Sequence, residues 1–227
     1  MAEMHVPNQE GLVEIYQRRA RHYDLYARLF PLAGMRVPTY RRQAVHALKL
    51  EAGDTVVEVG CGTGLNFPLL EGAVGPTGRI VGVDLTDAML AQARERVRAH
   101  GWQNVRLVQS DAAAFQFPPD LDGILSTFAL TLVPDYDRVI LNGCRALKVG
   151  KRWVVADFKM PSGALSKMAP LLAKLFVQPF GGNVSMANRH PWESMNKYLE
   201  DVSMNESYLG MVYVAVGERG ESGCRGE

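Results

Sequence analysis

The stretch at residues 55–65, TVVEVGCGTGL, constrains the fold of this chain more than any other. It opens with β-branched residues, which are typical of a buried parallel strand, and then places three glycines at alternate positions, Gly60, Gly62 and Gly64. Glycine is needed where the backbone adopts a positive φ or comes within contact distance of a ligand, because it has no Cβ. The next strand pattern, at 79–85, contains Asp84 near its end, where a carboxylate would meet a ribose at the carboxyl edge of the sheet. The two patterns together predict a nucleoside-cofactor site.

Strand and helix patterns alternate along the rest of the chain. Five strands are predicted at 55–59, 79–84, 105–109, 123–127 and 153–158. The helices predicted among them are at 66–70, 86–99 and 137–147, and a helix at 191–199 precedes a hairpin of 202–208 and 211–216. Strands joined by helices with short links favour a doubly wound α/β sheet that is mostly parallel, with right-handed crossovers. The hairpin adds two antiparallel strands, so seven strands are expected.

Three segments depart from the alternating pattern of the domain at 51–217. Residues 1–50 predict a helical cap, with an amphipathic helix at 9–30 and a second helix at 40–48. Residues 159–190 are rich in Pro, Gly, Met and bulky apolar side chains and exceed the length of a normal connection, so they predict an insertion over the active face. The tail at 218–227 is predicted to be disordered.

Composition and charge limit the class of protein. A chain of 227 residues with 47% hydrophobic content is long and apolar enough for one domain with a sizeable core. Its formal net charge of +1 gives no basic field of the kind that nucleic-acid binding requires. The charge is uneven, because residues 1–50 carry eight Lys or Arg against four acidic residues and residues 158–200 carry five against two. These two basic, apolar segments flank an acidic middle and are expected to determine which substrate the protein binds.

Cysteine usage and hydropathy bear on the compartment. The three cysteines, Cys61, Cys144 and Cys224, are too few and too scattered for a disulfide framework, and they lack the spacing of a zinc site. We therefore expect no metal and a reducing, cytoplasmic setting. The first residues lack the basic start and apolar run of a secretory signal, and no run of about 18 apolar residues could cross a bilayer. Any membrane role is expected to be peripheral, at the inner face.

The spacing of the glycines discriminates between nucleotide sites. A dinucleotide site has the pattern Gly-x-Gly-x-x-Gly, whereas this chain has Leu65 where the third glycine belongs and places Gly64 one position earlier. The loop EVGCGTG, followed by a strand that ends in Val83 and Asp84, resembles the first two motifs of class I S-adenosylmethionine-dependent methyltransferases. The resemblance covers roughly residues 48–159. It implies a Rossmann-like fold, with S-adenosylmethionine as the cofactor and S-adenosylhomocysteine as the product.

The resemblance implies roles for residues at the ends of successive strands. Glu58 matches the acidic residue that fixes the methionine ammonium group, Asp84 the one that binds both ribose hydroxyls, and Asp111 the one that holds the adenine edge. An isolated acidic residue is more often a helix cap or half of an ion pair, but three at successive strand ends favour the site. The further cofactor contacts expected are Gly60, Cys61, Gly62, Leu85, Met89, Ala112 and Ser126.

Methyl transfer from a sulfonium requires alignment and exclusion of water more than a dedicated catalytic group. Two candidate catalytic residues lie outside the central fold. The sequence RHYD at 21–24 resembles the R-x-Y-D element of many methyltransferases of this class, in which the tyrosine closes over the cofactor. Tyr23 is expected to do so here, with Tyr16 or Tyr26 as substitutes. His190 could act as a base or an anchor, because an unperturbed histidine has a pKa of about 6.5, or it could be an ordinary loop residue.

Together these features resemble the branch that holds ubiquinone and menaquinone C-methyltransferases and bacterial phospholipid N-methyltransferases. We expect a small-molecule or lipid acceptor, with the amine of a phospholipid headgroup favoured. A quinone-type C-methyl transfer or another O- or N-methyl transfer is the alternative, and a cofactor-binding regulatory protein is the alternative without enzyme activity. The insertion would touch an anionic membrane surface or cap the pocket.

Nucleic acid is not expected as a partner. Enzymes that methylate amino groups of bases carry Asn or Asp followed by two prolines and an aromatic residue after the fourth strand, where this chain reads STFA at 126–129. The chain is expected to be a monomer or a homodimer.

Overall fold

A seven-stranded sheet forms the centre of the molecule, in a computed structural model that describes residues 9–29, 34–160 and 189–225. The strand order is β3-β2-β1-β4-β5-β7-β6. The parallel strands are β1 (Thr55–Val59), β2 (Arg79–Asp84), β3 (Val105–Gln109), β4 (Leu121–Thr127) and β5 (Leu147–Phe158). β7 (Val212–Glu218) runs antiparallel to both β5 and β6 (Glu200–Ser207). The predicted doubly wound sheet with a C-terminal hairpin is confirmed.

The strand order reverses at β1, and this reversal positions the site. Val56 of β1 pairs with Ile80 of β2 on one side and with Gly123 of β4 on the other. In open α/β sheets, ligands bind in the crevice that such a reversal opens beyond the carboxyl ends of the strands. The glycine loop follows β1 directly and therefore lies at this crevice.

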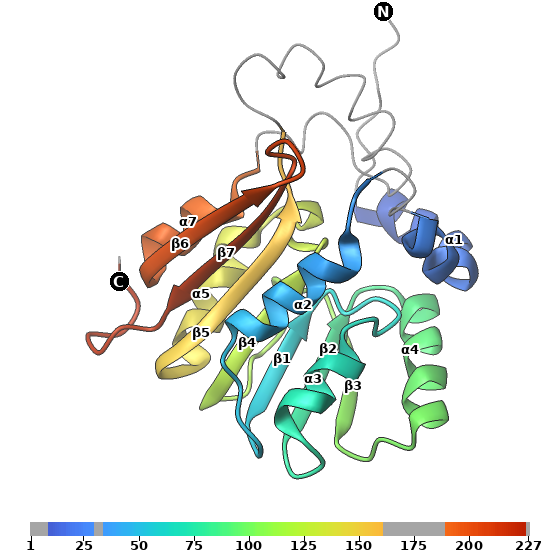
Figure 1. Cartoon of the computed structure of the whole chain (residues 1–227), viewed down its shortest axis with the longest axis horizontal. Coiled ribbons are helices and arrows are strands. Elements are labelled where there is room, and N and C mark those ends of the chain that lie inside the picture. The colour runs from blue at the N-terminus through green and yellow to red at the C-terminus, as the bar shows by residue number, and fades with distance from the viewer. Residues whose placement is uncertain (1–8, 30–33, 161–188, 226–227) are drawn as a thin grey trace, which may run out of the picture.

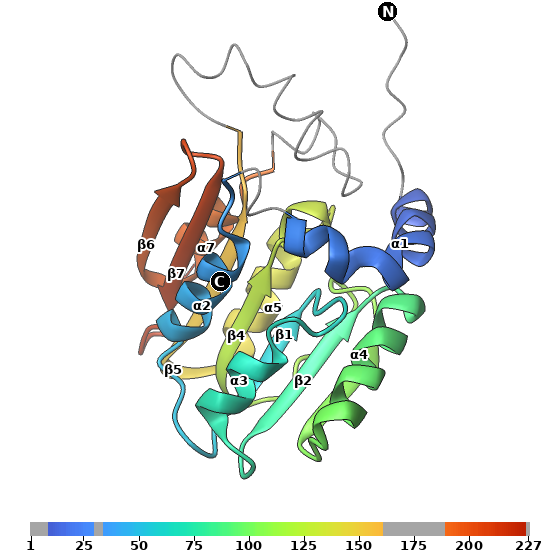
Figure 2. The same cartoon turned by 45° about the vertical axis from the view of Figure 1, so that its right-hand side comes forward.

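Helices cover both faces of the sheet (Figures 1 and 2). The face with α2 (Val37–Ala47), α3 (Phe67–Val74) and α4 (Asp87–His100) is opposite the face with α5 (Tyr136–Ala146) and α7 (Pro191–Tyr198). Alternate residues of β1 enter different cores, so Val56 packs with α2 and α3, whereas Val57 and Val59 pack with α5. Glu58 alternates with Val57 and Val59 and is therefore directed toward α2 and α3.

α1 (Gln9–Leu29) lies outside both layers and beside α4 (Figure 1). The amphipathic helix predicted at 9–30 is confirmed, as one uninterrupted helix. None of the helices in the described ranges is both long and apolar enough to span a membrane. The insertion predicted at 159–190 falls almost wholly on residues 161–188, outside the described residues.

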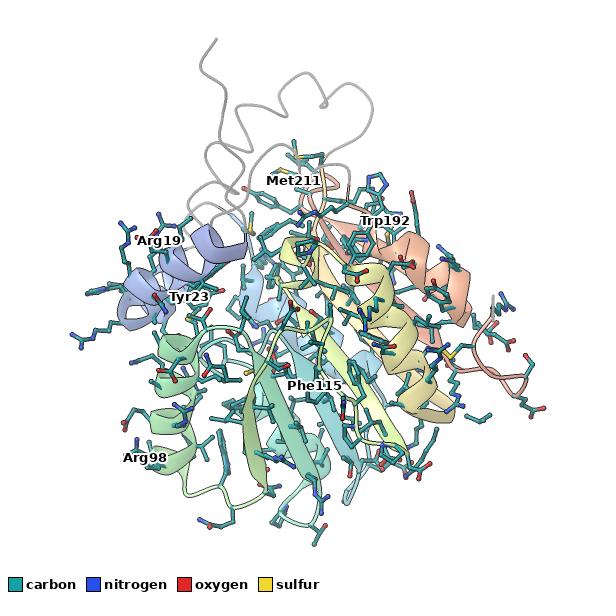
Figure 3. The ribbon with its side chains drawn as sticks, turned by 180° about the vertical axis from the view of Figure 1, so that it is seen from behind. Arg19, Tyr23, Arg98, Phe115, Trp192 and Met211 are labelled. Carbon is teal, nitrogen blue, oxygen red and sulfur yellow. A yellow bond between two sulfur atoms is a disulfide. The ribbon has the colours of Figure 1, made fainter. Side chains whose placement is uncertain are left out.

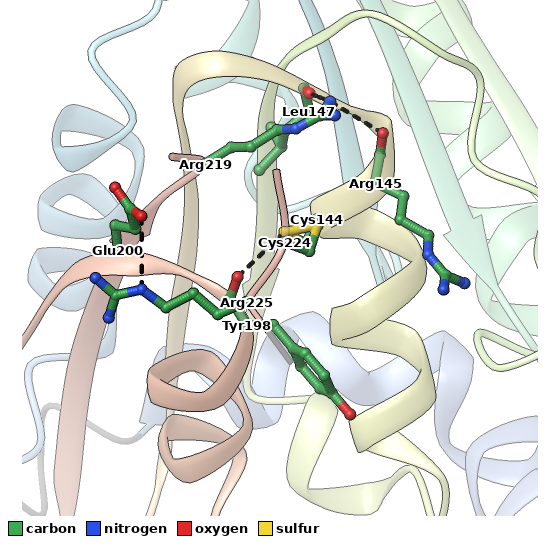
Figure 4. The surroundings of a disulfide bond; sticks show 8 residues. All are labelled: Cys144, Arg145, Leu147, Tyr198, Glu200, Arg219, Cys224 and Arg225. Atoms are coloured by element: carbon green, nitrogen blue, oxygen red, sulfur yellow. Dashed lines mark hydrogen bonds and ion pairs between the residues drawn. A yellow bond between two sulfur atoms is a disulfide. The ribbon is translucent and has the colours of Figure 1, made fainter. Parts of the chain in front are cut away.

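A disulfide joins Cys144 of α5 to Cys224 in the tail (Figure 4). The backbone N–H of Arg225 donates to Tyr198 O at 3.1 Å, and Nε of Arg225 lies 3.5 Å from the carboxylate of Glu200. The tail predicted to be disordered at 218–227 is therefore held against the domain as far as residue 225, because a covalent link and these contacts offset the entropy of ordering it.

The disulfide corrects the expectation drawn from the scattered cysteines. Cys144 and Cys224 are 80 residues apart in sequence, but the fold brings their Cα atoms to 6.0 Å. The inference of a reducing setting loses its basis, since disulfides persist chiefly in oxidising environments.

Candidate functional site

A pocket lies at the carboxyl ends of β1, β2 and β4, between the glycine loop and α1. Its empty space, including the part open to solvent, is about 940 Å³. The predicted site residues that line it are Gly60, Cys61, Gly62, Asp84, Leu85, Met89, Asp111, Ala112 and, from α1, Tyr23. The structure therefore brings together predicted residues from the ends of β1, β2 and β3.

The glycine loop is fastened to the end of β2. Gly60 and Cys61 donate their backbone N–H groups to Val83 O at 2.8 and 3.0 Å. Gly60 has a φ of +69° and Gly62 a φ of +55°, which favour glycine. A Cβ at Gly60 would overlap with Ala129, whereas a Cβ at Gly62 would meet only the end of Met89, at 3.8 Å. The backbone at Gly62 is thus open to a ligand, which suits a loop that approaches a cofactor closely.

Asp84 stands at the junction of the glycine loop and α4. Its carboxylate accepts hydrogen bonds from the backbone N–H groups of Gly62 and Thr86, both at 2.8 Å. Burial raises the pKa of Asp84, and the two N–H donors oppose this rise. A carboxylate has about four acceptor positions, so Asp84 can still accept hydrogen bonds from two hydroxyl groups of a ribose.

A buried polar cluster, made of Arg41, Glu58, Asn66 and Thr127, adjoins the pocket. Nη1 of Arg41 donates to Thr127 Oγ1 at 2.6 Å and to Asn66 Oδ1 at 3.2 Å. Nδ2 of Asn66 donates to Glu58 Oε1 at 2.6 Å and to Thr127 Oγ1 at 2.8 Å. Arg41 and Thr127 line the pocket, and Glu58 is fully buried beside them. Arg41 belongs to α2, Glu58 to β1 and Thr127 to β4, and Asn66 is the N-cap residue of α3. The cluster therefore exists only in the folded chain.

Two ionisable groups of this cluster have unused hydrogen-bonding capacity. Nε of Arg41 and Oε2 of Glu58 are buried and have no hydrogen-bond partner among the described residues. Burial raises the pKa of Glu58 to about 8, although Arg41 and the hydrogen bond from Asn66 act to lower it. A guanidinium beside a carboxyl group suits the opposite charges of an α-amino acid group. The cluster therefore fits the methionine part of the cofactor.

Arg41 was not among the predicted site residues, yet the sequence holds a signal for it. In the predicted helix at 40–48, Arg41 occupies the same helical face as Ala44, Val45 and Leu48. All four are buried in the structure. A buried arginine needs partners, and such a residue on an apolar face marks a candidate site.

α1 contributes Val13, Tyr16 and Tyr23 to the pocket wall. The ring centroids of the two tyrosines are 6.3 Å apart, and Figure 3 shows Tyr23 where α1 approaches α4. Burial raises the pKa of both phenols above the ordinary value. Both are therefore neutral at neutral pH, so they can donate or accept hydrogen bonds but do not supply a phenolate.

The segment after β4 forms an apolar side of the pocket. Phe128 has a φ of +56°, which is rare for a residue with a side chain, and its ring packs on Phe158 with centroids 4.8 Å apart. Asp157, at the end of β5, accepts a hydrogen bond from the N–H of Thr131 at 2.9 Å and so fixes the segment. Burial raises the pKa of Asp157 to about 6. The rest of this side consists of Ala129, Leu132, Val133 and Pro134.

Two other predicted residues lie away from the pocket wall. Ser126 is fully buried within β4, and Thr127 and Phe128, which follow it, line the pocket instead. His190 stands at the start of α7, where its ring stacks on Trp192 with centroids 4.6 Å apart and its Nδ1 lies 2.9 Å from Glu193 Oε1. Cys61 does line the pocket, but burial raises the pKa of its thiol well above the ordinary value, which disfavours a nucleophilic thiolate.

Known proteins are similar to this chain in sequence and in fold. A family profile, described as the ubiE/COQ5 methyltransferase family, matches residues 4–215. A demethylmenaquinone methyltransferase of Shouchella clausii is 28% identical over 177 residues, which are 78% of this chain and 74% of the relative. One of Staphylococcus aureus is 28% identical over 187 residues, 82% of this chain and 76% of the relative.

A solved structure has the same fold. It is geranyl diphosphate C-methyltransferase from Streptomyces coelicolor A3(2), in complex with Mg2+, geranyl diphosphate and S-adenosyl-L-homocysteine. It aligns with a TM-score of 0.63 at 17% identity and covers 80% of this chain and 79% of that chain. At this identity the likeness supports the fold alone.

Proposed function

Because the chain belongs to the ubiE/COQ5 methyltransferase family, we propose that it transfers a methyl group from S-adenosylmethionine to a ring carbon of a reduced, quinone-type aromatic acceptor. The observation that carries the choice of acceptor is the apolar side of the pocket. Tyr16, Tyr23 and Phe128 offer aromatic surfaces, and aliphatic residues after β4 complete this side. Such a wall fits a flat ring with little charge.

The residues present fit the methyl donor. Asp84 would accept hydrogen bonds from the ribose, and Asp111 and Ala112 would border the adenine. Arg41 and Glu58 would take the carboxylate and the ammonium of the methionine part, since each has an unpartnered buried atom. When bound, the cofactor supplies an electrophilic methyl group on a sulfonium. Nothing in the pocket wall has to activate that group, so the residues mainly align it and exclude water.

The acceptor must supply the electrons for the new bond. A hydroquinone ring is electron-rich at carbon, whereas the oxidised quinone is not. The ring carbon would gain a bond to the methyl carbon in place of the methyl–sulfur bond, whose electrons would stay on the sulfur. The ring carbon would then release its proton, which would leave the pocket for bulk solvent. Tyr23, as a neutral phenol, would hydrogen-bond a ring hydroxyl and hold the ring in line with the methyl group. His190 is not included in this proposal, because it stands outside the pocket wall.

The amine of a phospholipid headgroup, which the sequence favoured, is less well supported. The two relatives compared above are named for demethylmenaquinone rather than for an amine. Moreover, the charged residues in the described pocket wall are Arg41, Asp84 and Asp111. Arg41 and Asp84 are engaged on the cofactor side, so this wall offers a headgroup phosphate no further cation. A quinone with a long apolar tail would be met at a membrane surface, which retains the peripheral contact expected from the sequence.

The proposal is tested by acceptor competition. Purified protein is incubated with methyl-labelled S-adenosylmethionine and one of three acceptors: a demethylated naphthoquinone kept reduced with dithionite, the same compound oxidised, or phosphatidylethanolamine vesicles. We expect label on a ring carbon of the reduced compound only, as located by mass spectrometry of the product. Label on the vesicle amine would overturn the proposal that the acceptor is a quinone-type ring. Methylation of the oxidised compound at the same rate as the reduced compound would overturn the proposed requirement for an electron-rich ring. The Tyr23→Phe variant should retain S-adenosylhomocysteine binding and lose turnover.

A further inference from the structure

The aspartate of the RHYD element has no part in the function proposed above, yet it makes contacts that its neighbours do not. Asp24 of α1 accepts a hydrogen bond from Thr63 Oγ1 at 2.6 Å through its Oδ1. Its other oxygen, Oδ2, forms an ion pair with Arg96 of α4. Arg96 in turn donates from Nε to Thr63 O at 2.9 Å. The three residues therefore form a closed ring of contacts, which we call the Asp24 clamp.

The clamp joins three elements that border the pocket. Asp24 belongs to α1, Thr63 to the glycine loop, and Arg96 to α4. Thr63 is 2% exposed, and the side chains of Asp24 and Arg96 are 35% and 21% exposed, so the clamp is partly shielded from water. Hydrogen bonds to charged groups are stronger than those between neutral groups. The clamp can therefore hold α1 in place beyond what apolar packing of the helix provides.

The position of Tyr23 next to Asp24 indicates which part of α1 the Asp24 clamp would hold in place. Tyr23 is the immediate neighbour of Asp24 and lines the pocket, as does Tyr16 two helical turns earlier. We propose that Asp24 and Arg96 are positioning residues, which act through Thr63 to hold α1, with Tyr16 and Tyr23, over the bound cofactor. The proposal rests on the proposed function for the identity of the cofactor. It extends that function by assigning part of the retention of the cofactor to Asp24 and Arg96, which do not line the described pocket themselves but hold Thr63, which does.

A matched control lies on the same helix. Glu14 and Arg18 of α1 form an ion pair with side chains 63% and 70% exposed, and neither residue is in the described pocket lining. Exposed pairs of this kind contribute little. Glu14→Ala and Asp24→Ala remove the same charge from the same helix, so they differ in the loss of the clamp.

The first measurement is the dissociation rate of S-adenosylhomocysteine, followed by rapid dilution of the loaded protein. We expect Asp24→Ala to raise this rate roughly tenfold, since a charged hydrogen bond of about 1.4 kcal/mol corresponds to that factor. Thr63→Val should raise it less, and Glu14→Ala should leave it unchanged. Added salt should raise the rate more for the natural sequence than for Asp24→Asn, because salt screens the contacts of the zwitterionic S-adenosylhomocysteine in both proteins but screens the ion pair of the clamp only in the natural sequence. Equal rates for Asp24→Ala and Glu14→Ala would overturn the proposal.

The second measurement does not need the cofactor. Both variants are compared without cofactor, and their unfolding temperatures should be equal, so that a difference in exchange reports local opening of α1. Amide hydrogen exchange of residues 16–29 should then be faster in Asp24→Ala than in Glu14→Ala. Equal exchange would overturn the clamp even if the chain bound no S-adenosylhomocysteine, whereas absence of binding with different exchange would overturn only the proposed function. If Asp24→Ala does not fold, Asp24→Asn and Thr63→Val take its place in both measurements.

Discussion

At neutral pH the carboxyl group of Glu58 holds a proton in the cofactor-free protein, because burial raises its pKa to about 8. Arg41 opposes this rise and Asp84 adds to it, and Asn66 donates to one of its oxygens. The ammonium of a bound methionine group would lower the pKa of Glu58 again, since an opposite charge nearby favours the ionised form. Binding is then expected to release a proton.

We predict that S-adenosylhomocysteine binds more tightly as the pH rises from about 6 to about 8, because less work is needed to ionise Glu58. Titration calorimetry across this pH range gives the affinity, and buffers with different ionisation enthalpies report the released proton. Glu58→Gln should bind roughly tenfold more weakly and lose most of the pH dependence. An affinity of the natural sequence that stays flat over this range would contradict the assignment of Glu58 to the ammonium.

At this scale, the sequence allowed part of the site to be predicted. Asp84 and the glycines follow strand patterns directly, so their positions at the carboxyl edge follow from the fold class. Asn66 and Thr127 carry no motif of their own, and they acquire a role only when α3 and β4 meet Arg41 in three dimensions. Ser126 is absent from the pocket wall for a different, local reason, because successive side chains of a strand point to opposite faces and Thr127, the next residue, faces the pocket.

At the scale of the elements, α5 packs against the sheet at Gly143 so closely that no side chain fits between them. A Cβ at this position would overlap with the ring of Trp153 in β5 and lie 2.9 Å from Ile124 Cδ1 in β4. Trp153 and Ile124 are fully buried, so neither can move aside without disturbing the core. The glycine therefore sets the distance between helix and sheet.

Gly143→Ala is predicted to lower the free energy of unfolding, because overpacking costs about 1–3 kcal/mol and outweighs the gain of up to about 1 kcal/mol in helix propensity. Urea unfolding measures the change. Gly72→Ala in α3 is the matched control, since a Cβ there would meet nothing within 4 Å. That variant should be stabilised by about 0.5–1 kcal/mol. A stabilised Gly143→Ala protein would show that α5 can shift without loss.

The same contrast between local and distant information explains which elements could be predicted. Strands and helices came from periodicity, and the predicted strand at 105–109 and the helix at 9–30 were close to the structure. β5 begins at Leu147, six residues before the predicted strand, because Leu147 pairs with Leu121 of β4 and Arg152 pairs with both Gly123 of β4 and Glu218 of β7. The order of the tail depends on a partner cysteine 80 residues away, which no local pattern reports.

At the scale of the whole molecule, the Cys144–Cys224 disulfide closes a large loop of chain that contains β5, β6 and β7. Such a link restricts the unfolded chain and stabilises the fold by about 2–4 kcal/mol. We predict that a reductant lowers the unfolding temperature by roughly 5–15 °C, on the scale of about 2–4 °C per kcal/mol for a domain of this size.

Differential scanning calorimetry with and without dithiothreitol measures this shift. Cys224→Ser should unfold near the temperature of the reduced protein and should not respond to the reductant. A natural sequence whose unfolding temperature is the same in both conditions would argue against a stabilising disulfide.

The position of β7 between β5 and β6 has a consequence for biosynthesis. β6 leaves the ribosome before β7, but in the finished sheet it pairs only with β7. The edge of β5 therefore stays unpaired in the nascent chain until residues 212–218 have emerged. An uncovered edge strand can pair with another chain. Translation that stalls before this point would leave a template for aggregation, so we expect this protein to depend on completed synthesis more than a fold whose last strand is added at the edge.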